Sequence, residues 1–141
     1  MLKKRLIAGV AACLMVVSAF SMSASANTYA WTDTIRVYKN QGAYLTNACV
    51  KLNVQNYFKV NIQPDKNVSD AWSQGTELIY ARARDTNNKY ASSLVETRYA
   101  GGFTPLYYSG YGVFGYSYKC AAQYADSNPH QYAALTLNWE P

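Results

Sequence analysis

Histidine, the side chain best suited to acid–base catalysis near neutral pH, occurs once in this sequence. His130 lies in Asn128-Pro129-His130-Gln131, a run that is typical of a turn. A Ser–His–Asp arrangement stays open, but no Gly-x-Ser-x-Gly motif supports it. We therefore interpret His130 as a solvent-exposed loop residue and predict that the protein is not an enzyme.

Paired carboxyl groups are the chemical requirement for glycoside hydrolysis. Asp70, Glu77, Asp85 and Glu96 are the candidates for such a pair. Tyrosines around them would suit a sugar cleft, yet their spacing follows no catalytic motif. A small glycan hydrolase is therefore an alternative hypothesis, and we predict no catalytic residue.

One segment has oxygen ligands at alternate positions, as the start of a calcium loop does. It is Asp65-Lys66-Asn67-Val68-Ser69. The sixth position is Asp70 where glycine is expected, and the twelfth is Thr76 where glutamate is expected. A zinc site lacks ligands, because there is one histidine. We predict a polar turn here, no metal site and no cofactor.

The N-terminus has the three parts of a secretory signal peptide. Lys3, Lys4 and Arg5 precede an apolar stretch over residues 6–20, and small residues follow up to Ala26. The apolar stretch of about fifteen residues is shorter than the roughly twenty that a bilayer requires. We predict a signal peptide over 1–26 and a single secreted domain over 27–141, with no membrane span after cleavage.

The three cysteines divide between these two parts. Cys13 ends a run, Val10-Ala11-Ala12-Cys13, that resembles a lipoprotein box, so lipidation at Cys13 is an alternative to simple cleavage. Cys49 and Cys120 remain in the exported part, where thiols are oxidised and only one pairing exists. We predict a Cys49–Cys120 disulfide, which would stabilise the fold by roughly 4 kcal/mol.

The net charge of +5 overstates how basic the exported domain is. Three of the thirteen basic residues lie in the signal, which leaves ten basic against eight acidic residues, or +2. Nucleic-acid binding needs a clustered basic face, which the scattered charges do not provide. We therefore predict no nucleic-acid partner.

Alternating apolar and polar residues predict most of the fold. The longest run covers residues 50–62 and predicts one strand, or two strands in line with a bend near Asn56. Further strands are expected over 34–38, 77–84, 92–99, 114–124 and 132–139, separated by turn-forming residues. About six to eight strands of this kind predict an all-β fold, an antiparallel β-sandwich of immunoglobulin-like size.

Tyrosine is unusually abundant, with fourteen residues, all of them in 27–141. Tyr107, Tyr108, Tyr111 and Tyr116 lie close together in a segment that also contains three glycines. Tyrosine suits half-buried strands, but a cluster in a loop also suits a flat binding surface for sugars or proteins. We take these four tyrosines as the candidate ligand-binding residues.

Tyr118-Lys119-Cys120 resembles the corner of an immunoglobulin-like domain, where a tyrosine stands two residues before the second cysteine. That resemblance implies two sheets joined by the disulfide. Trp72 is too far after Cys49 to match the core tryptophan of such domains. The overall layout, with a signal followed by a tyrosine-rich domain ending near Trp139, also resembles small exported β proteins of Gram-positive bacteria that have no assigned activity.

These observations favour a non-enzymatic secreted binding module. It would act at the bacterial cell envelope through its tyrosine-rich surface, on a glycan or a protein partner. A secreted bacteriocin-like antagonist or toxin is the alternative, because small size, export and mild positive charge permit it. No cationic cluster or amphipathic helix requires it.

Overall fold

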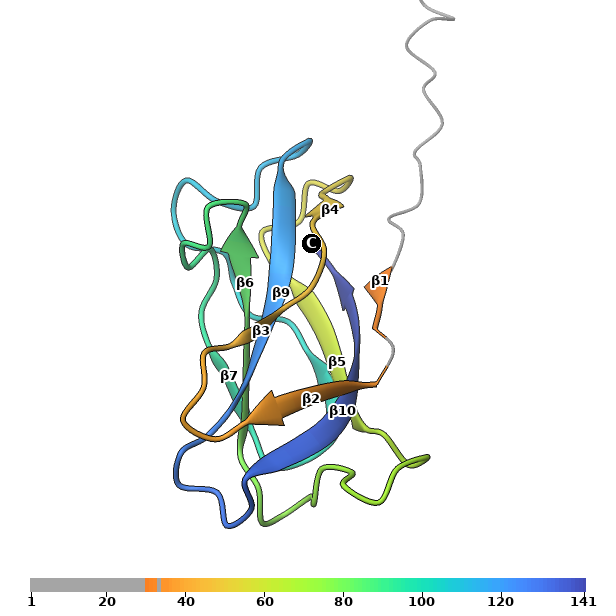
Figure 1. Cartoon of the computed structure of the whole chain (residues 1–141). Coiled ribbons are helices and arrows are strands. Elements are labelled where there is room, and N and C mark those ends of the chain that lie inside the picture. Colours follow the sequence, from red (N-terminus) through yellow and green to blue (C-terminus); the bar gives the residue numbers. More distant parts are fainter. Residues whose placement is uncertain (1–29, 33) are drawn as a thin grey trace, which may run out of the picture.

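The computed structural model describes residues 30–32 and 34–141, so the predicted signal peptide and Cys13 lie outside the described residues. Within this part the chain forms strands and turns without any helix, arranged as two layers (Figure 1). No helix in the described part has the length and apolar character needed to cross a membrane. The prediction of an all-β sandwich is confirmed.

The first sheet contains five antiparallel strands. Its order is β1 (Ala30–Trp31), β10 (Tyr132–Glu140), β5 (Lys59–Pro64) and β8 (Gly101–Phe103), and β2 (Ile35–Tyr38) also pairs with β10. β10 is therefore the strand on which most of this sheet is built.

The second sheet also contains five antiparallel strands. Its order is β3 (Tyr44–Leu45), β9 (Ser117–Tyr124), β6 (Ile79–Asp85) and β7 (Val95–Thr97), and β4 (Cys49–Val50) also pairs with β9. The ten strands exceed the six to eight expected, because β1, β3 and β4 are two-residue strands with no period of their own.

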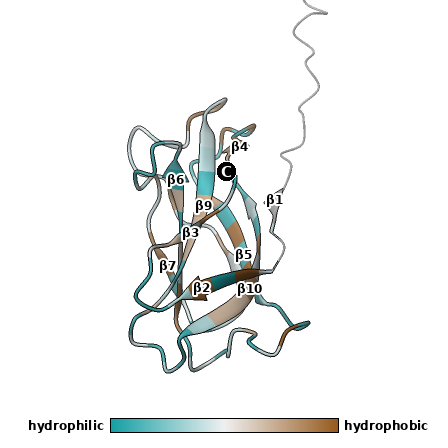
Figure 2. Cartoon of the chain, viewed as in Figure 1, coloured by the Kyte–Doolittle hydropathy of each residue, from teal (hydrophilic) through white to brown (hydrophobic). Residues whose placement is uncertain are grey.

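Strict alternation of burial confirms the strands that the sequence predicts most clearly. Along β6, Ile79, Ala81 and Ala83 are buried against the other sheet, and the residues between them face outward. Burial alternates in the same way along β2 and β5. Figure 2 shows hydrophobic and hydrophilic segments within these strands. Period-two side chains lie on opposite faces of a strand, so these faces follow directly from the sequence.

The prediction of continuous strand over residues 50–62 is wrong in its middle. Only β4 and β5 are strands there, and residues 51–58 form a loop apart from an isolated bridge at Tyr57. The alternation is broken by burial, because Lys51 is fully buried while Val54 is 89% exposed. Apolar residues with period two therefore did not mark a sheet face in this segment.

The core lies between the two sheets and combines large rings with small side chains. Phe58 and Trp139 of the first layer pack with ring centroids 5.8 Å apart, and Tyr118 fills the second layer. Burying a large apolar side chain contributes about 1.5–3 kcal/mol, so each of these rings contributes to the stability of the core. Alanines of β6 and β9 leave room for them.

The two cysteines lie in one sheet, on the neighbouring strands β4 and β9. The immunoglobulin-like resemblance implies a disulfide that joins the two sheets. A bridge between Cys49 and Cys120 would instead lie within one sheet. Trp72 lies outside the strands, 2% exposed, and its indole N–H donates to the Glu77 carbonyl at 2.9 Å. The fold is a sandwich, but these two features are arranged differently from that family's pattern.

Candidate functional site

The four tyrosines expected to bind a ligand lie in different environments. Tyr107 is 5% exposed, and its ring packs on that of Tyr118 with centroids 5.0 Å apart. Burial, together with the Tyr118 hydroxyl and the nearby thiols, raises the pKa of Tyr107. The Tyr118 hydroxyl accepts a hydrogen bond from the Val113 N–H at 3.1 Å. The buried rings of Tyr107 and Tyr118 thus lie on the inner side of the tyrosine-rich segment and hold it in place.

The other three tyrosines are nearer the surface. Tyr116 is 65% exposed and Tyr108 is 45% exposed, whereas Tyr111 is half-buried and packs against the core. Gly112 has a φ of +74°, and a Cβ at this position would lie 2.7 Å from Cδ2 of Tyr107. A glycine is therefore required here so that the loop can pass close over the Tyr107 ring.

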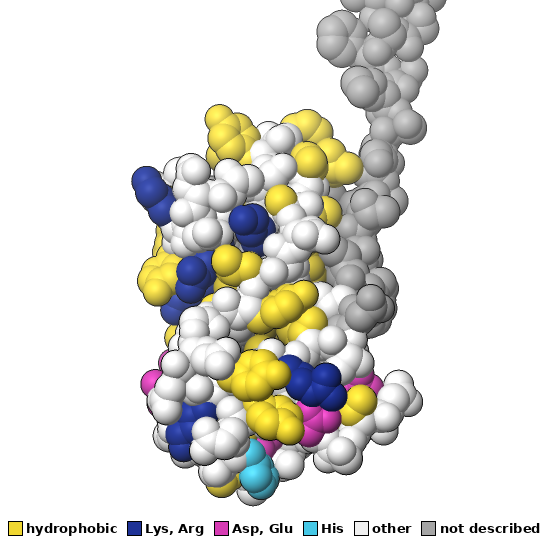
Figure 3. Space-filling view, in the orientation of Figure 1, with side chains coloured by type: hydrophobic (Ala, Val, Ile, Leu, Met, Phe, Trp, Pro, Cys, Tyr) yellow, Lys and Arg dark blue, Asp and Glu magenta, His cyan; other side chains and the backbone are white. Residues whose placement is uncertain are grey.

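Apolar side chains from other loops lie exposed beside these tyrosines. Seven of the thirteen exposed large hydrophobic residues in the described part belong to β4 and to the loops that connect β4 to β5 and β8 to β9. Figure 3 shows apolar side chains gathered at this end of the molecule. We call this surface the apolar end; it consists of Val50, Val54, Leu106, Tyr108, Val113, Phe114 and Tyr116.

Sequence reasoning missed the members of the apolar end that are not tyrosines. The alternating run over residues 50–62 predicts Val54 on the apolar face of a strand, in phase with the buried residues of β5. Phe114 was expected at the start of the β9 strand. The sequence did contain a signal that Phe114 lies in a loop. Val113 and Phe114 stand between Gly112 and Gly115, and closely spaced glycines are typical of turns and loops.

Backbone hydrogen bonds join the loops of the apolar end to each other. The Lys51 N–H donates to the Tyr116 carbonyl at 2.8 Å, and the Gly115 N–H donates to the Lys51 carbonyl at 2.8 Å. The Tyr107 N–H donates to the Asn56 carbonyl at 3.2 Å. The exposed side chains are therefore carried on loops whose backbone is held in place.

A buried polar cluster lies beneath these loops. The Lys51 ammonium donates to Asn53 Oδ1 at 2.6 Å and lies 5.0 Å from the centroid of the Tyr107 ring. Asn53 Nδ2 donates to Glu140 Oε1 at 3.0 Å, and Lys59 Nζ lies 3.0 Å from Glu140 Oε2. Burial lowers the pKa of Lys51, while Glu140 opposes that shift. These hydrogen bonds tie the loop after β4 to the C-terminal strand β10.

Cys49 and Cys120 both lie against the core between the sheets. In the pairing of β4 with β9, however, Cys120 is two residues away from the residue opposite Cys49. Cys49 lies opposite Tyr118, whereas Cys120 exchanges hydrogen bonds with Thr46. The structure records no disulfide between Cys49 and Cys120. Diagonal neighbours across an antiparallel pair have Cα atoms roughly 7–8 Å apart, beyond the usual disulfide range. Burial raises the pKa of both thiols.

His130 belongs to a second polar group, around a buried carboxylate. Its side chain is 65% exposed, and Nδ1 lies 2.5 Å from Glu77 Oε1. Glu77 is 2% exposed and also accepts from the Tyr124 hydroxyl at 2.6 Å and from the Ser73 N–H at 2.7 Å. Burial, and then the bond to Glu77, raises the pKa of Tyr124. The carboxylate thus ties two loops together and is enclosed by donors.

The remaining candidate carboxylates are spread over the molecule. Asp70 shares a hollow with Glu77 and His130, but its oxygens bind the Arg36 guanidinium at 2.6 and 3.2 Å. Asp85 Oδ1 accepts the N–H of Lys89 within a turn, and Glu96 is exposed on β7. In the described residues no group of three histidine, cysteine or acidic side chains is placed to hold a metal ion.

Comparison of the chain with family models, with curated proteins and with solved structures found no match.

Proposed function

We propose that the protein is a non-enzymatic binding module that acts at the bacterial cell envelope, with the apolar end as its ligand-binding surface. The observation that carries this proposal is the gathering of exposed hydrophobic side chains on loops of one end. Exposed hydrophobic side chains grouped on one surface are typical of interaction sites.

The loops that carry the apolar end are held in place by buried contacts, and this order favours a binding role for the exposed side chains. Ordering flexible side chains and loops on association lowers affinity, so a surface that is already ordered binds better. The hydrogen bonds of Lys51 and the packing of Tyr107 supply this order. The rings of Tyr108, Phe114 and Tyr116 would stack on the apolar faces of sugar units in an envelope glycan.

The test is co-sedimentation of the exported protein with washed cell walls and insoluble glycans. The variant combines Tyr108→Ser, Phe114→Ser and Tyr116→Ser, all at exposed positions. A matched control is Tyr99→Ser, because Tyr99 has the same 65% exposure as Tyr116 but lies in the β7–β8 loop. We expect saturable pelleting that the triple variant loses and the control keeps.

Two outcomes contradict this proposal. Absence of pelleting removes the envelope glycan as ligand, and a growth-inhibition assay on related strains then tests the secreted antagonist. Equal pelleting by the triple variant and the parent protein places binding elsewhere on the molecule. Thermal unfolding of each variant, measured in parallel, separates a binding defect from a folding defect.

We also propose that Cys49 and Cys120 form a disulfide after export. Their positions on neighbouring strands and the same inner face support this, and because β4 has only two residues, its approach to Cys120 would disturb only one short strand. The two thiols lose two hydrogens to the disulfide of an exported oxidoreductase, which becomes a dithiol. Intact mass without reductant should be about 2 Da lower than after reduction. Alkylation of both cysteines before reduction would contradict the bridge.

A further inference from the structure

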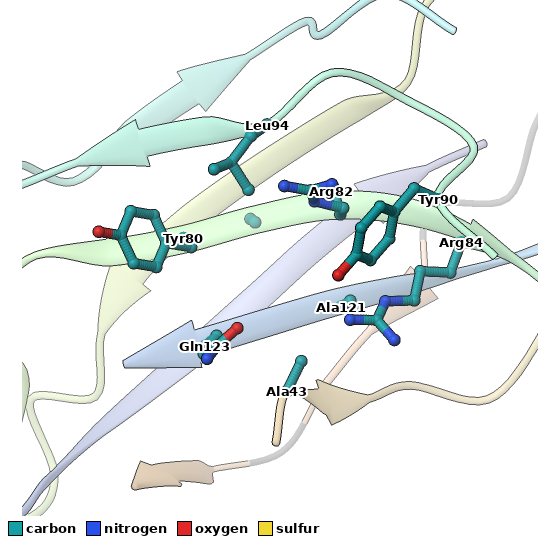
Figure 4. Close-up of a pocket in the computed structure, with 9 residues that line it drawn as sticks. Ala43, Tyr80, Arg82, Arg84, Tyr90, Leu94, Ala121 and Gln123 are labelled. Carbon is teal, nitrogen blue, oxygen red and sulfur yellow. The ribbon is translucent and has the colours of Figure 1, made fainter. Parts of the chain in front are cut away.

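A second surface, on the outer face of the second sheet, combines two arginines with two tyrosines. Tyr80, Arg82 and Arg84 alternate along β6 with its buried residues and therefore point away from the core. Together with Tyr90, they line a hollow of about 200 Å³ (Figure 4). Ala121 and Gln123 of β9 form its floor. This arginine pocket is separate from the apolar end.

The two guanidinium groups are held against one ring. The Arg82 guanidinium carbon lies 4.1 Å from the centroid of the Tyr90 ring, and that of Arg84 lies 4.9 Å from it. Cation–π stacking uses the face of a guanidinium and leaves the N–H donors in its plane for other partners. The stacking therefore orients both groups without consuming their hydrogen-bonding capacity.

Most of those donors have no acceptor among the residues that the structure describes. Arg84 Nη1 donates to the Asn88 carbonyl at 3.4 Å, whereas Arg84 Nε is buried and has no hydrogen-bond partner. In the part of the chain that the structure describes, neither Arg82 nor Arg84 forms an ion pair. The donors of both guanidinium groups other than Arg84 Nε are thus the ones that a ligand oxygen could use.

The charges around the pocket are predominantly positive. Lys119 lies opposite Arg84 on β9. The nearest acidic residues along the strands are Glu96, opposite Tyr80 on β7, and Asp85, whose Oδ1 accepts the Lys89 N–H. With no acidic partner beside them in the described part of the chain, the two guanidinium groups favour an anion electrostatically.

The rest of the lining indicates what carries the anion. Ala43, Leu94 and Ala121 supply apolar surface beside the arginines, and Gln123 supplies an amide. Inorganic phosphate would use only the arginines, whereas a sugar ring would also contact the apolar side chains and the tyrosine rings. The volume suits a single sugar-sized group and is smaller than that of sites for drug-sized ligands.

We propose that the arginine pocket binds a carboxylate-bearing sugar, with the carboxylate held by Arg82 and Arg84 and the ring packed against Tyr80 and Tyr90. Planar guanidinium groups bind carboxylates with two parallel hydrogen bonds, which gives the site its preference for this group. The sequence contained the signal as Tyr80-x-Arg82-x-Arg84 on the outward face of a predicted strand, but Tyr90 comes from beyond the following turn.

The test is calorimetric titration of the exported protein with glucuronate, glucose and inorganic phosphate at low salt. We expect glucuronate to bind, to weaken as salt rises, and to lose about tenfold in affinity in Arg84→Gln, which corresponds to about 1.4 kcal/mol. Arg82→Gln should weaken binding as well and leaves the buried Nε of Arg84 untouched. Arg98→Gln is the matched control, because Arg98 is an exposed arginine that binds the Thr76 carbonyl outside the pocket.

Three results would overturn the proposal: no binding of glucuronate, equal binding of phosphate and glucuronate, or unchanged affinity in both pocket variants. Thermal unfolding of each variant identifies any that does not fold. The proposal does not depend on the apolar end. The triple variant at Tyr108, Phe114 and Tyr116 should retain glucuronate binding, whatever its effect on cell-wall pelleting.

Discussion

Replacement of Glu77 by glutamine tests how much the buried carboxylate contributes to stability. Glu77 accepts from the Tyr124 hydroxyl, the Ser73 N–H and the His130 ring at 2.5–2.7 Å, and its side chain is 2% exposed. Glutamine has the same shape, but its amide nitrogen is a donor that then faces one of these donors. A hydrogen bond to a charged group contributes about 1.5–3 kcal/mol, so we expect Glu77→Gln to cost about 2–4 kcal/mol.

The assay is urea unfolding at neutral pH, followed by tryptophan fluorescence and circular dichroism, because buried Trp72 contacts Glu77. Tyr124→Phe removes one donor and should cost about 1.5–3 kcal/mol on its own. The Glu77→Gln and Tyr124→Phe effects should sum to more than the cost of the double variant, since both remove the same bond. A cost below about 0.5 kcal/mol for Glu77→Gln would refute the view that this carboxylate holds the two loops together.

Two further changes probe the loops and the acid stability. Gly112→Ala should lower the free energy of unfolding in urea by about 1–3 kcal/mol, because Gly112 has a φ of +74° and the new Cβ would meet the Tyr107 ring. Gly102→Ala is the control and should cost far less, because no atom lies within 4 Å of a Cβ at Gly102. A hydrogen bond from the Thr34 hydroxyl lowers the pKa of Asp65, so its stabilisation is present above about pH 4 and lost as pH falls through the lowered value. The difference in urea midpoint between the parent protein and Asp65→Asn should therefore shrink from about pH 5 to about pH 2, and a constant difference would contradict this reasoning.

The faces of the long strands could be predicted from the sequence because burial there follows period two. Ile79, Ala81 and Ala83 point inward on β6, as the alternation indicated. Residues 51–58 could not be predicted in this way. The burial of Lys51 depends on Asn53 and Glu140, and the latter partner is far away in the sequence.

The candidate sites were predicted only in part, because contacts between distant segments decide them. The tyrosine-rich segment was located correctly as a loop, but spacing does not distinguish buried Tyr107 from exposed Tyr108. His130 is exposed as expected, yet its contact with Glu77 spans 53 residues. The stacking of Arg82 on Tyr90 likewise depends on how the chain returns after a turn.

The central place of β10 has a consequence for the order in which the chain folds. β1, β2 and β5 each pair with β10, and Ala30 meets Trp139 across 109 residues. Such pairings close long loops, and folding dominated by them is slow. During synthesis, which starts at the N-terminus, β1, β2 and β5 cannot pair with β10 until residues 132–140 have been made. The first sheet therefore forms late, after the strands of the second sheet, which ends at residue 124, are already available to pair.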